Sequence, residues 1–171
     1  YMFPRKALES VIDVIAEERD LPLRLLMVGE GPAGYLESLK KRCRDLQIED
    51  RVQFLPFASR QELARLFSSV DVGIWPGNNS LVTLEAMACR LPIIMADLQL
   101  AHLVGFENGF KVPYADRAAL QKAIVTLARN GELRKTMGQN SEDAIHKHYS
   151  YASLARTVGL WMEELVAQRK A

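Results

Sequence analysis

Short apolar runs alternate along the chain with segments in which apolar residues recur every three or four positions. The runs have the length and composition of buried strands, and the periodic segments are typical of amphipathic helices. Expected strands lie at 23–28, 52–54, 71–75, 91–96 and 110–112, with residues 1–3 as the end of another. Expected helices lie at 8–15, 36–46, 59–67, 80–89, 116–130, 132–148 and 153–168, with a helical turn at 100–104.

This alternation of strands and helices predicts an α/β fold. Strands that are joined by helices pair in parallel, and right-handed crossovers place helices on both faces of the sheet. We therefore predict a doubly wound parallel sheet followed by C-terminal helices. Ligands of such sheets bind beyond the carboxyl ends of the strands. We therefore expect ligand-binding residues in the loops after Phe3, Val28, Phe54, Trp75 and Ala96.

Local signals indicate where some helices begin and end. Ser59 and Glu62 form a capping-box pattern, and Asp116 is a typical N-cap residue. Asn130 and Gly131 are residues that end helices. These positions agree with the boundaries that hydrophobic periodicity indicates.

Length and composition limit the functional classes. The 171 residues suit one domain, and the hydrophobic share of 49% is ordinary for a globular protein. A net charge of +1 argues against a nucleic-acid partner. Cys43 and Cys89 lie in apolar helical patterns, which favours buried free thiols, and no zinc spacing is present. We expect a cytoplasmic location, because free thiols persist in reducing compartments.

The loop after Val28 is rich in glycine. The run Gly29-Glu30-Gly31-Pro32-Ala33-Gly34 matches the dinucleotide fingerprint. Pro32 removes a backbone N–H that a pyrophosphate would use, and the next strand ends without an acidic residue for a ribose. Two other interpretations stay open. One is a tight turn with Pro32 in the first helical position; the other is a floor of small residues, Gly29 and Gly31, that lets a nucleotide approach the backbone.

The loop after Trp75 is small and polar and leads directly into a helix. Its last residues are Asn78 and Asn79. The first N–H groups of the helix would point out of the sheet end and, with the helix dipole, form an anion site. The amides concerned are those of Ser80, Leu81 and Val82. Simple capping of the helix by Asn79 or Ser80 is the alternative.

Charged side chains at the same sheet edge add candidates. Glu85 is a carboxylate in an apolar helix, where it could accept hydrogen bonds from two ribose hydroxyls or only face solvent. Arg5 and Lys6 follow the first expected strand, where they would meet a diphosphate or begin a solvated helix. No Ser-His-Asp spacing or paired acids stand out, although His102 lies near a sheet-end loop.

Taken in order, these segments resemble the C-terminal domain of the group 1 retaining glycosyltransferases. The resemblance is carried by Gly29–Pro32, Val52–Leu55, Asp71–Pro76, Leu81–Cys89 and Leu91–Ile94, with Glu107–Phe110 and Tyr149–Tyr151 also fitting. Members have the GT-B architecture, in which two Rossmann-like domains enclose the active site. The resemblance implies that residues 1–171 form a single nucleotide-sugar-binding domain. It also implies an N-terminal acceptor domain that this chain lacks.

The resemblance assigns roles to individual residues. Lys6 corresponds to the catalytic lysine that contacts the donor diphosphate, and Glu85 to the glutamate that binds the donor ribose. Phe57 lies where the family forms its base pocket. Residues 78–82 correspond to the loop and helix start whose amides meet phosphate and sugar. The nucleotide sugar is then a substrate, and neither a cofactor nor a metal is expected.

Several positions depart from the family pattern. Gly77 stands eight residues before Glu85, where the family has its first motif glutamate. A contact to the donor sugar is therefore lost or passes to Asn78 or Asn79. The other departures are Arg90 and Pro56, both in place of glycine, and Tyr1 in place of an arginine.

The function that the resemblance implies is transfer of a sugar, with retention, from a nucleotide sugar to a hydroxyl acceptor. The acceptor would be a glycan, a lipid-linked molecule or another hydroxyl compound, and the missing domain could attach to the inner face of a membrane. The isolated chain should bind donor and transfer nothing. A non-catalytic sugar-nucleotide-binding subunit or pseudoenzyme is the main alternative, motivated by Gly77. A sugar-nucleotide epimerase and a dehydrogenase are the other two.

Overall fold

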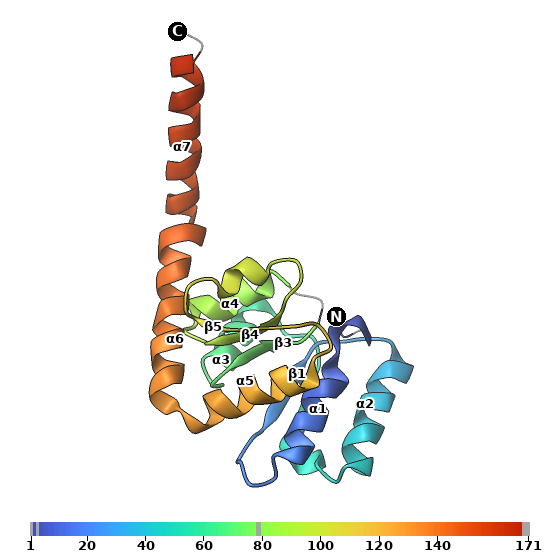
Figure 1. The fold of residues 1–171 in the computed structure, drawn as a ribbon. Helices are drawn as coiled ribbons and strands as arrows, with labels where there is room; N and C mark the ends of the chain where they lie inside the picture. The colour runs from blue at the N-terminus through green and yellow to red at the C-terminus, as the bar shows by residue number, and fades with distance from the viewer. Residues whose placement is uncertain (1, 3, 78–79, 169–171) are drawn as a thin grey trace.

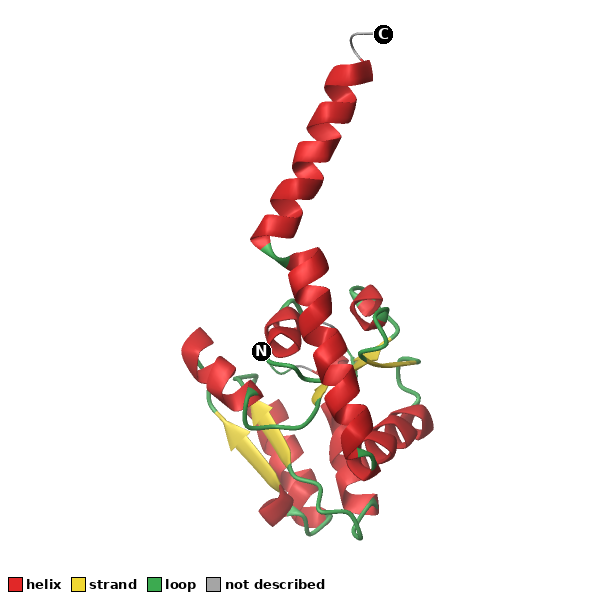
Figure 2. Ribbon diagram, turned by 90° about the vertical axis from the view of Figure 1, so that its left-hand side faces the viewer, coloured by secondary structure: helices red, strands yellow, loops and turns green. Residues whose placement is uncertain are grey.

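The strands of the structure run parallel and form two separate sheets. The computed structural model describes residues 2, 4–77 and 80–168. Figure 2 shows the strands as two groups of arrows, and no ladder joins β1 to β3 in the described chain. One sheet is β1 (Leu25–Val28) with β2 (Val52–Leu55); the other is β3 (Gly73–Trp75), β4 (Ile93–Ala96) and β5 (Gly109–Val112), in that order. The predicted α/β class with parallel strands is confirmed, but one continuous ladder is not formed.

The helices follow the predicted alternation with the strands (Figure 1). The α-helices are α1 (Leu8–Glu17), α2 (Ala33–Asp45), α3 (Arg60–Phe67), α4 (Val82–Ala88), α5 (Arg117–Arg129), α6 (Gly131–Ala144) and α7 (Tyr151–Gln168). The shorter elements are η1 (Pro4–Lys6), η2 (Glu49–Arg51) and η3 (Ala101–Val104), which are 3₁₀-helices, and the π-helix η4 (Ile145–Tyr149). Among the helices described, none is both long and apolar enough to cross a membrane.

Successive side chains of β4 face two different helix layers. Ile94 packs in a cluster with Val14 of α1 and the buried face of α5. Ile93 and Met95 face the other way, into a cluster with Met87 of α4. All of these side chains are fully buried. The strand is therefore covered on both faces, as its continuous apolar run predicts.

Helix α1 packs against both sheets at once. Ile12 and Ile15 belong to the cluster that contains Met27 of β1. Val11 and Val14 belong to the cluster that contains residues of β4, β5 and α5. Because two adjacent stripes of α1 are apolar, this one helix connects the two halves of the core.

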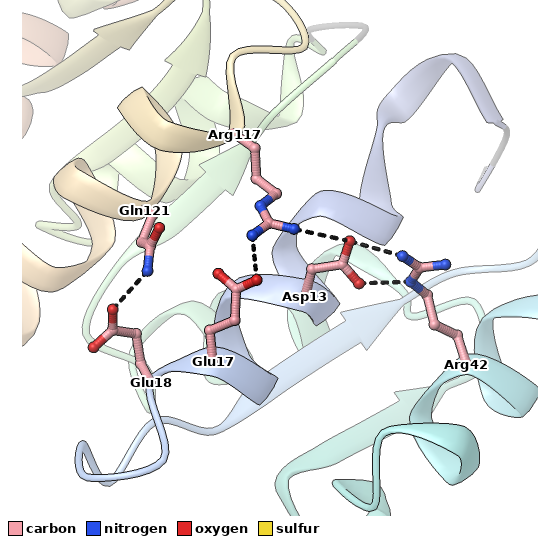
Figure 3. Close-up of polar contacts among 6 residues, drawn as sticks. All are labelled: Asp13, Glu17, Glu18, Arg42, Arg117 and Gln121. Atoms are coloured by element: carbon pink, nitrogen blue, oxygen red, sulfur yellow. Dashed lines mark hydrogen bonds and ion pairs between the residues drawn. The ribbon is translucent and has the colours of Figure 1, made fainter.

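Polar contacts at α1 reinforce the same connection (Figure 3). Asp13 accepts a hydrogen bond from Nε of Arg42 on α2 at 2.6 Å. Its other carboxylate oxygen lies 3.9 Å from Nη1 of Arg117 on α5. Further contacts join Arg117 to Glu17 and Gln121 to Glu18. The side chain of Asp13 is only 15% exposed, so this cluster is better shielded than an ordinary surface pair.

The predicted helix caps are confirmed. The Ser59 hydroxyl accepts from the N–H of Glu62, whose carboxylate in turn accepts from the N–H of Ser59. The carboxylate of Asp116 accepts from the N–H of Ala119. The side chain of Asn130 caps α6, so this residue both ends α5 and begins the next helix.

Two local predictions are wrong. Cys89 is a free thiol, like Cys43, but it is only partly buried, because it lies at the C-terminal cap of α4 and not inside the helix. Pro32 is the N-cap residue of α2 and not its first helical residue, since its ψ of 131° is extended. Helix α4 ends at Ala88, one residue before the expected boundary, and α2 begins at Ala33, directly after Pro32.

Candidate functional site

The loops after β1 and β3 and the turn before α1 meet at the carboxyl edge of the strands. Lys6, Val28 and Gly77 line a cavity of about 150 Å³, together with other residues of β1 and β3. Gly77 packs directly on the backbone of the turn. An ideal β-carbon on Gly77 would lie 2.5 Å from the carbonyl carbon of Lys6, closer than real contacts allow.

Lys6 is a half-buried cation at this edge. It ends η1 and lines the cavity. Desolvation by burial lowers the pKa of its ammonium group below the usual value, because the charged form loses water. Among the described residues no carboxylate forms an ion pair with Lys6. An anionic ligand would supply the missing counter-charge.

The start of α4 is organised by Ser80. Its carbonyl accepts from both the N–H and the hydroxyl of Thr83, at 3.0 and 2.7 Å. The N–H of Val82 makes a long bond of 3.4 Å to the Ser80 hydroxyl, so this amide has a weak internal partner that a ligand oxygen could displace. The side chain of Leu81 is 66% exposed. Asn78 and Asn79 lie outside the described residues.

Glu85 lies in the first turn of α4, since the helix begins at Val82. Its carboxylate accepts a hydrogen bond of 3.1 Å from Nε of Arg60, the first residue of α3. The Glu85 side chain is 32% exposed and that of Arg60 is 85% exposed. The carboxylate is thus accessible and forms an ion pair with an exposed cation on one side.

Phe57 lies in the loop between β2 and α3, close in sequence to Arg60. Its side chain is 70% exposed, the most open of the phenylalanines described. An exposed aromatic ring beside a ligand edge is suited to stacking on a planar base. Pro56, which replaces a family glycine, belongs to the same loop and is also exposed.

The glycine-rich loop after β1 accommodates the start of the chain. Gly29 has a φ of 127°, which only glycine adopts without strain. Gly31 lies directly under the carbonyl group of Met2, leaving no room for a side chain. The N–H of Met2 donates to the carbonyl of Glu30 at 2.5 Å. At Gly31, the absence of a side chain therefore allows the backbone at Met2 to pack closely against this loop.

The three histidines belong to two other elements. His102 is exposed on η3, and His146 and His148 belong to the π-helix η4. In the described part of the chain no three His, Cys, Asp or Glu side chains are arranged to hold a metal ion. The sequence predicts Lys6, Ser80 and Glu85 as neighbours at the sheet edge, but nothing in it pointed to Arg60. Arg60 follows the cap residue Ser59 at the start of α3, but its contact with Glu85 depends on how α3 and α4 pack.

Comparison with known proteins agrees with this geometry. The model of the family described as glycosyl transferases group 1 matches residues 1–130. Because this is well over half of the chain, the chain belongs to that family. D-inositol 3-phosphate glycosyltransferase from Corynebacterium efficiens is 26% identical over 96% of this chain, and the match spans 41% of the relative. The chain therefore corresponds to less than half of such proteins.

Solved structures share the fold. Sucrose-phosphate synthase from Thermosynechococcus elongatus has a TM-score of 0.81 and 26% identity, covering 97% of this chain and 44% of that one. Anabaena Alr3699/HepE in complex with UDP and glucose has the same TM-score at 22% identity, covering 95% of this chain and 46% of that one. The chain is thus a glycosyltransferase domain with the fold of one part of these larger proteins.

Proposed function

We propose that this domain binds the nucleotide-sugar donor of a retaining glycosyltransferase. The observation that carries the proposal is the placement of Lys6 at the same strand edge as the start of α4, in a chain of this family. Lys6 is a half-buried cation that forms no ion pair with a carboxylate of the described residues. A nucleoside diphosphate carries negative charge that would pair with the ammonium group of Lys6. Two further side chains extend the site from that edge. Glu85 provides a hydrogen-bond acceptor for hydroxyl groups, and Phe57 provides an aromatic face.

The chemistry follows from charge that develops on the leaving group. When the bond between the anomeric carbon and the diphosphate oxygen breaks, negative charge grows on the diphosphate. The Lys6 ammonium group and the first amides of α4 would stabilise that charge, each well-placed donor contributing about 3 kcal/mol. Glu85 would hold the ribose by accepting from its two hydroxyl groups, displacing Arg60 from one carboxylate oxygen. Gly29, Asn78, Asn79, Ser80, Leu81 and Val82 complete the proposed donor site.

The acceptor side belongs to a second domain in this proposal. The relative from Corynebacterium efficiens is more than twice as long as the matched region, and its name specifies an inositol phosphate acceptor. A hydroxyl acceptor of some kind, on a glycan or a lipid-linked molecule, is what such a domain would present. The 171 residues alone would then bind donor and transfer no sugar. A cytoplasmic location, with the second domain resting on the inner membrane face, is compatible with this arrangement.

A non-catalytic sugar-nucleotide-binding protein is the second candidate, and one observation favours it. Gly77 occupies the position of the first motif glutamate, and its α-carbon is packed on the backbone of Lys6. A glutamate could enter only if the turn at Arg5 and Lys6 moved. A site that cannot hold that carboxylate retains the features for binding the nucleotide but loses one contact to the sugar.

Calorimetric titration with UDP and with inorganic pyrophosphate tests donor binding. Lys6→Met should weaken binding of both ligands by more than about tenfold, because a charge-assisted hydrogen bond contributes about 1.5–3 kcal/mol. Lys111→Met is the matched control, since Lys111 is exposed, pairs with Asp97 and is not a residue of the proposed site. Equal affinities for UDP in the wild type and the Lys6 variant would refute the proposed site. Turnover by the complete protein then separates the enzyme from the non-catalytic candidate.

A further inference from the structure

Helices α3 and α4 contact each other beside the candidate ribose carboxylate, Glu85. Nε of Arg60, in the first turn of α3, lies 3.1 Å from a carboxylate oxygen of Glu85. Farther along the same two helices, the thiol of Cys89 lies 4.0 Å from the carbonyl oxygen of Ala64. The position of the Arg60 guanidinium group next to Glu85 therefore follows from the packing of one helix along another.

The turn before α3 brings an aromatic ring and this guanidinium group to the surface together. Ala58 is buried and anchors the turn to the body of the domain. On either side of it, the side chains of Phe57 and Arg60 are exposed. The capping box of Ser59 and Glu62 fixes the first turn of α3, on which Arg60 lies. The ring and the guanidinium group therefore extend from one short, anchored segment.

Three side chains of the proposed donor site would contact parts that every ribonucleoside diphosphate has. Lys6 would pair with the diphosphate, and Glu85 would accept from the ribose hydroxyl groups. Phe57 would stack on the base, but an aromatic ring stacks on any base because each base has a π face. Selectivity among bases would therefore have to come from a side chain that meets the edge of the base.

Arg60 is placed for such a contact if Glu85 holds the ribose. The base is attached to the ribose carbon next to one of the two hydroxyl-bearing carbons, so it begins close to the Glu85 carboxylate. A base that stacks on Phe57 then lies on the side of Glu85 where Arg60 forms its ion pair. The hydrogen bond to Glu85 uses Nε of Arg60, so the N–H groups of its two Nη atoms would meet the edge of that base.

A guanidinium group has hydrogen-bond donors only, so it distinguishes bases by a single substituent. Uracil and guanine carry a carbonyl oxygen at the ring position where cytosine and adenine carry an amino group. The carbonyl oxygen can accept a hydrogen bond from Arg60, whereas the amino group presents a second donor to it. We propose that Arg60 makes this site selective for nucleoside diphosphates with such an oxo base over those with an amino base. The inference rests on the proposed donor site and adds the class of base to it.

Calorimetric titration with two matched pairs of nucleotides tests this selectivity. UDP and CDP form one pair, and inosine diphosphate and ADP form the other. Ring size and diphosphate charge are the same within each pair, so the comparison isolates the edge of the base. The wild type should bind the oxo member of each pair on the order of tenfold more tightly, since Arg60 donates a charge-assisted hydrogen bond to that member alone.

Replacing Arg60 by glutamine should remove most of this preference. The glutamine amide both donates and accepts, so in Arg60→Gln the ratio of the two affinities should fall below about threefold, mainly because CDP and ADP bind more tightly. Arg65→Gln is the matched control, since Arg65 is an exposed arginine farther along the same helix, and it should keep the full preference. Pyrophosphate, which has no base, should bind the wild type and Arg60→Gln equally, which shows that the variant is folded.

The possible results separate this inference from the donor site on which it rests. Equal affinities of the wild type for UDP and CDP, or for the two purine nucleotides, would overturn the selectivity. The donor site would still stand in that case if Lys6→Met weakened binding of the same nucleotides. A preference that persists in Arg60→Gln would assign recognition of the base to another residue. Absence of binding by all four nucleotides would reject the donor site, and this inference with it.

Discussion

The α-carbon of Gly77 lies against the backbone of Lys6, so that a β-carbon added to Gly77 would be 2.5 Å from the Lys6 carbonyl carbon. Gly77 follows β3 and Lys6 precedes α1, so this contact joins two segments that are 71 positions apart in the chain. The Lys6 backbone can occupy this position only because residue 77 has no side chain. In this protein the loss of the motif glutamate and the location of Lys6 are therefore one structural feature.

Adding a single methyl group at Gly77 should disturb this contact. Gly77→Ala forces the backbone at Arg5 and Lys6 to shift, and we expect a loss of about 1–3 kcal/mol in the free energy of unfolding, as for other overpacked positions. UDP affinity should also fall, because Lys6 moves. Urea denaturation and calorimetry measure the two effects. Gly34→Ala is the control, since no atom lies within 4 Å of its added β-carbon; equal effects of the two changes would contradict this account.

Glu85 and Arg60 should contribute very differently to nucleotide binding. Glu85→Gln weakens the acceptor for the ribose hydroxyls, so UDP affinity should fall by more than about tenfold while pyrophosphate affinity is unchanged. Arg60→Gln should change UDP affinity by less than about threefold, because such exposed pairs are worth about 0–1 kcal/mol. Titrations with both ligands test this. If Glu85→Gln weakened UDP and pyrophosphate equally, Glu85 would not be a ribose ligand.

Lys6 should make nucleotide binding and stability depend on pH in opposite directions. Burial lowers the Lys6 pKa from 10.5, so the unfolded chain keeps the proton at pH values where the folded chain has released it. Stability from this group therefore rises with pH between the lowered pKa and 10.5. Diphosphate affinity should fall over the same window, because the bound anion needs the charged form.

The control for this pH dependence is Lys6→Arg, which stays charged at all these pH values. Calorimetric titration of UDP from neutral pH to 10.5 compares the two proteins. A fall in affinity that is identical in Lys6→Arg would assign the pH dependence to another group.

Arg90 carries a backbone strain that glycine would remove. Its φ of 61° lies in the left-handed region, which glycine adopts without strain. Nε of Arg90 also donates to Glu142 at 2.7 Å, so the strain is best isolated in a Glu142→Gln background. There, Arg90→Gly should raise the free energy of unfolding by about 1 kcal/mol. Thermal denaturation of the two variants measures the difference; a decrease would mean that the arginine stem contributes more packing than the strain costs.

Asp13 should contribute more to stability than its surface position suggests. Asp13→Asn keeps the shape of the side chain but weakens the contacts to Arg42 and Arg117, which connect α1 to α2 and α5 (Figure 3). We expect a loss of about 1.5–3 kcal/mol. Asp45→Asn, which removes an exposed pair with Lys41, should cost less than about 0.5 kcal/mol. Similar losses in the two variants by urea denaturation would show that the Asp13 cluster is no more than a surface pair.

The sequence by itself determined the local structure of this protein. The alternation of apolar runs and periodic segments predicted each strand that the structure describes. The signal is clearest at β4, because burial on two faces requires a continuous apolar run. The caps at Ser59 and Asp116 were predictable because each depends on a side chain and an amide only three residues apart. The order of the motifs also identified the family before any contact was known.

Only the tertiary structure decided which distant residues touch. Residues that are far apart in the chain meet in the pairing of Glu85 with Arg60 and in the packing of Gly77 on Lys6. The same holds for the cavity between β1 and β3. Such contacts depend on how helices and strands pack against one another. Hydrophobic periodicity and helix capping describe only residues that are close in sequence, so they do not predict these contacts. Arg90 illustrates both sources: the family pattern marks the position as unusual, whereas only its φ of 61° gives the physical reason.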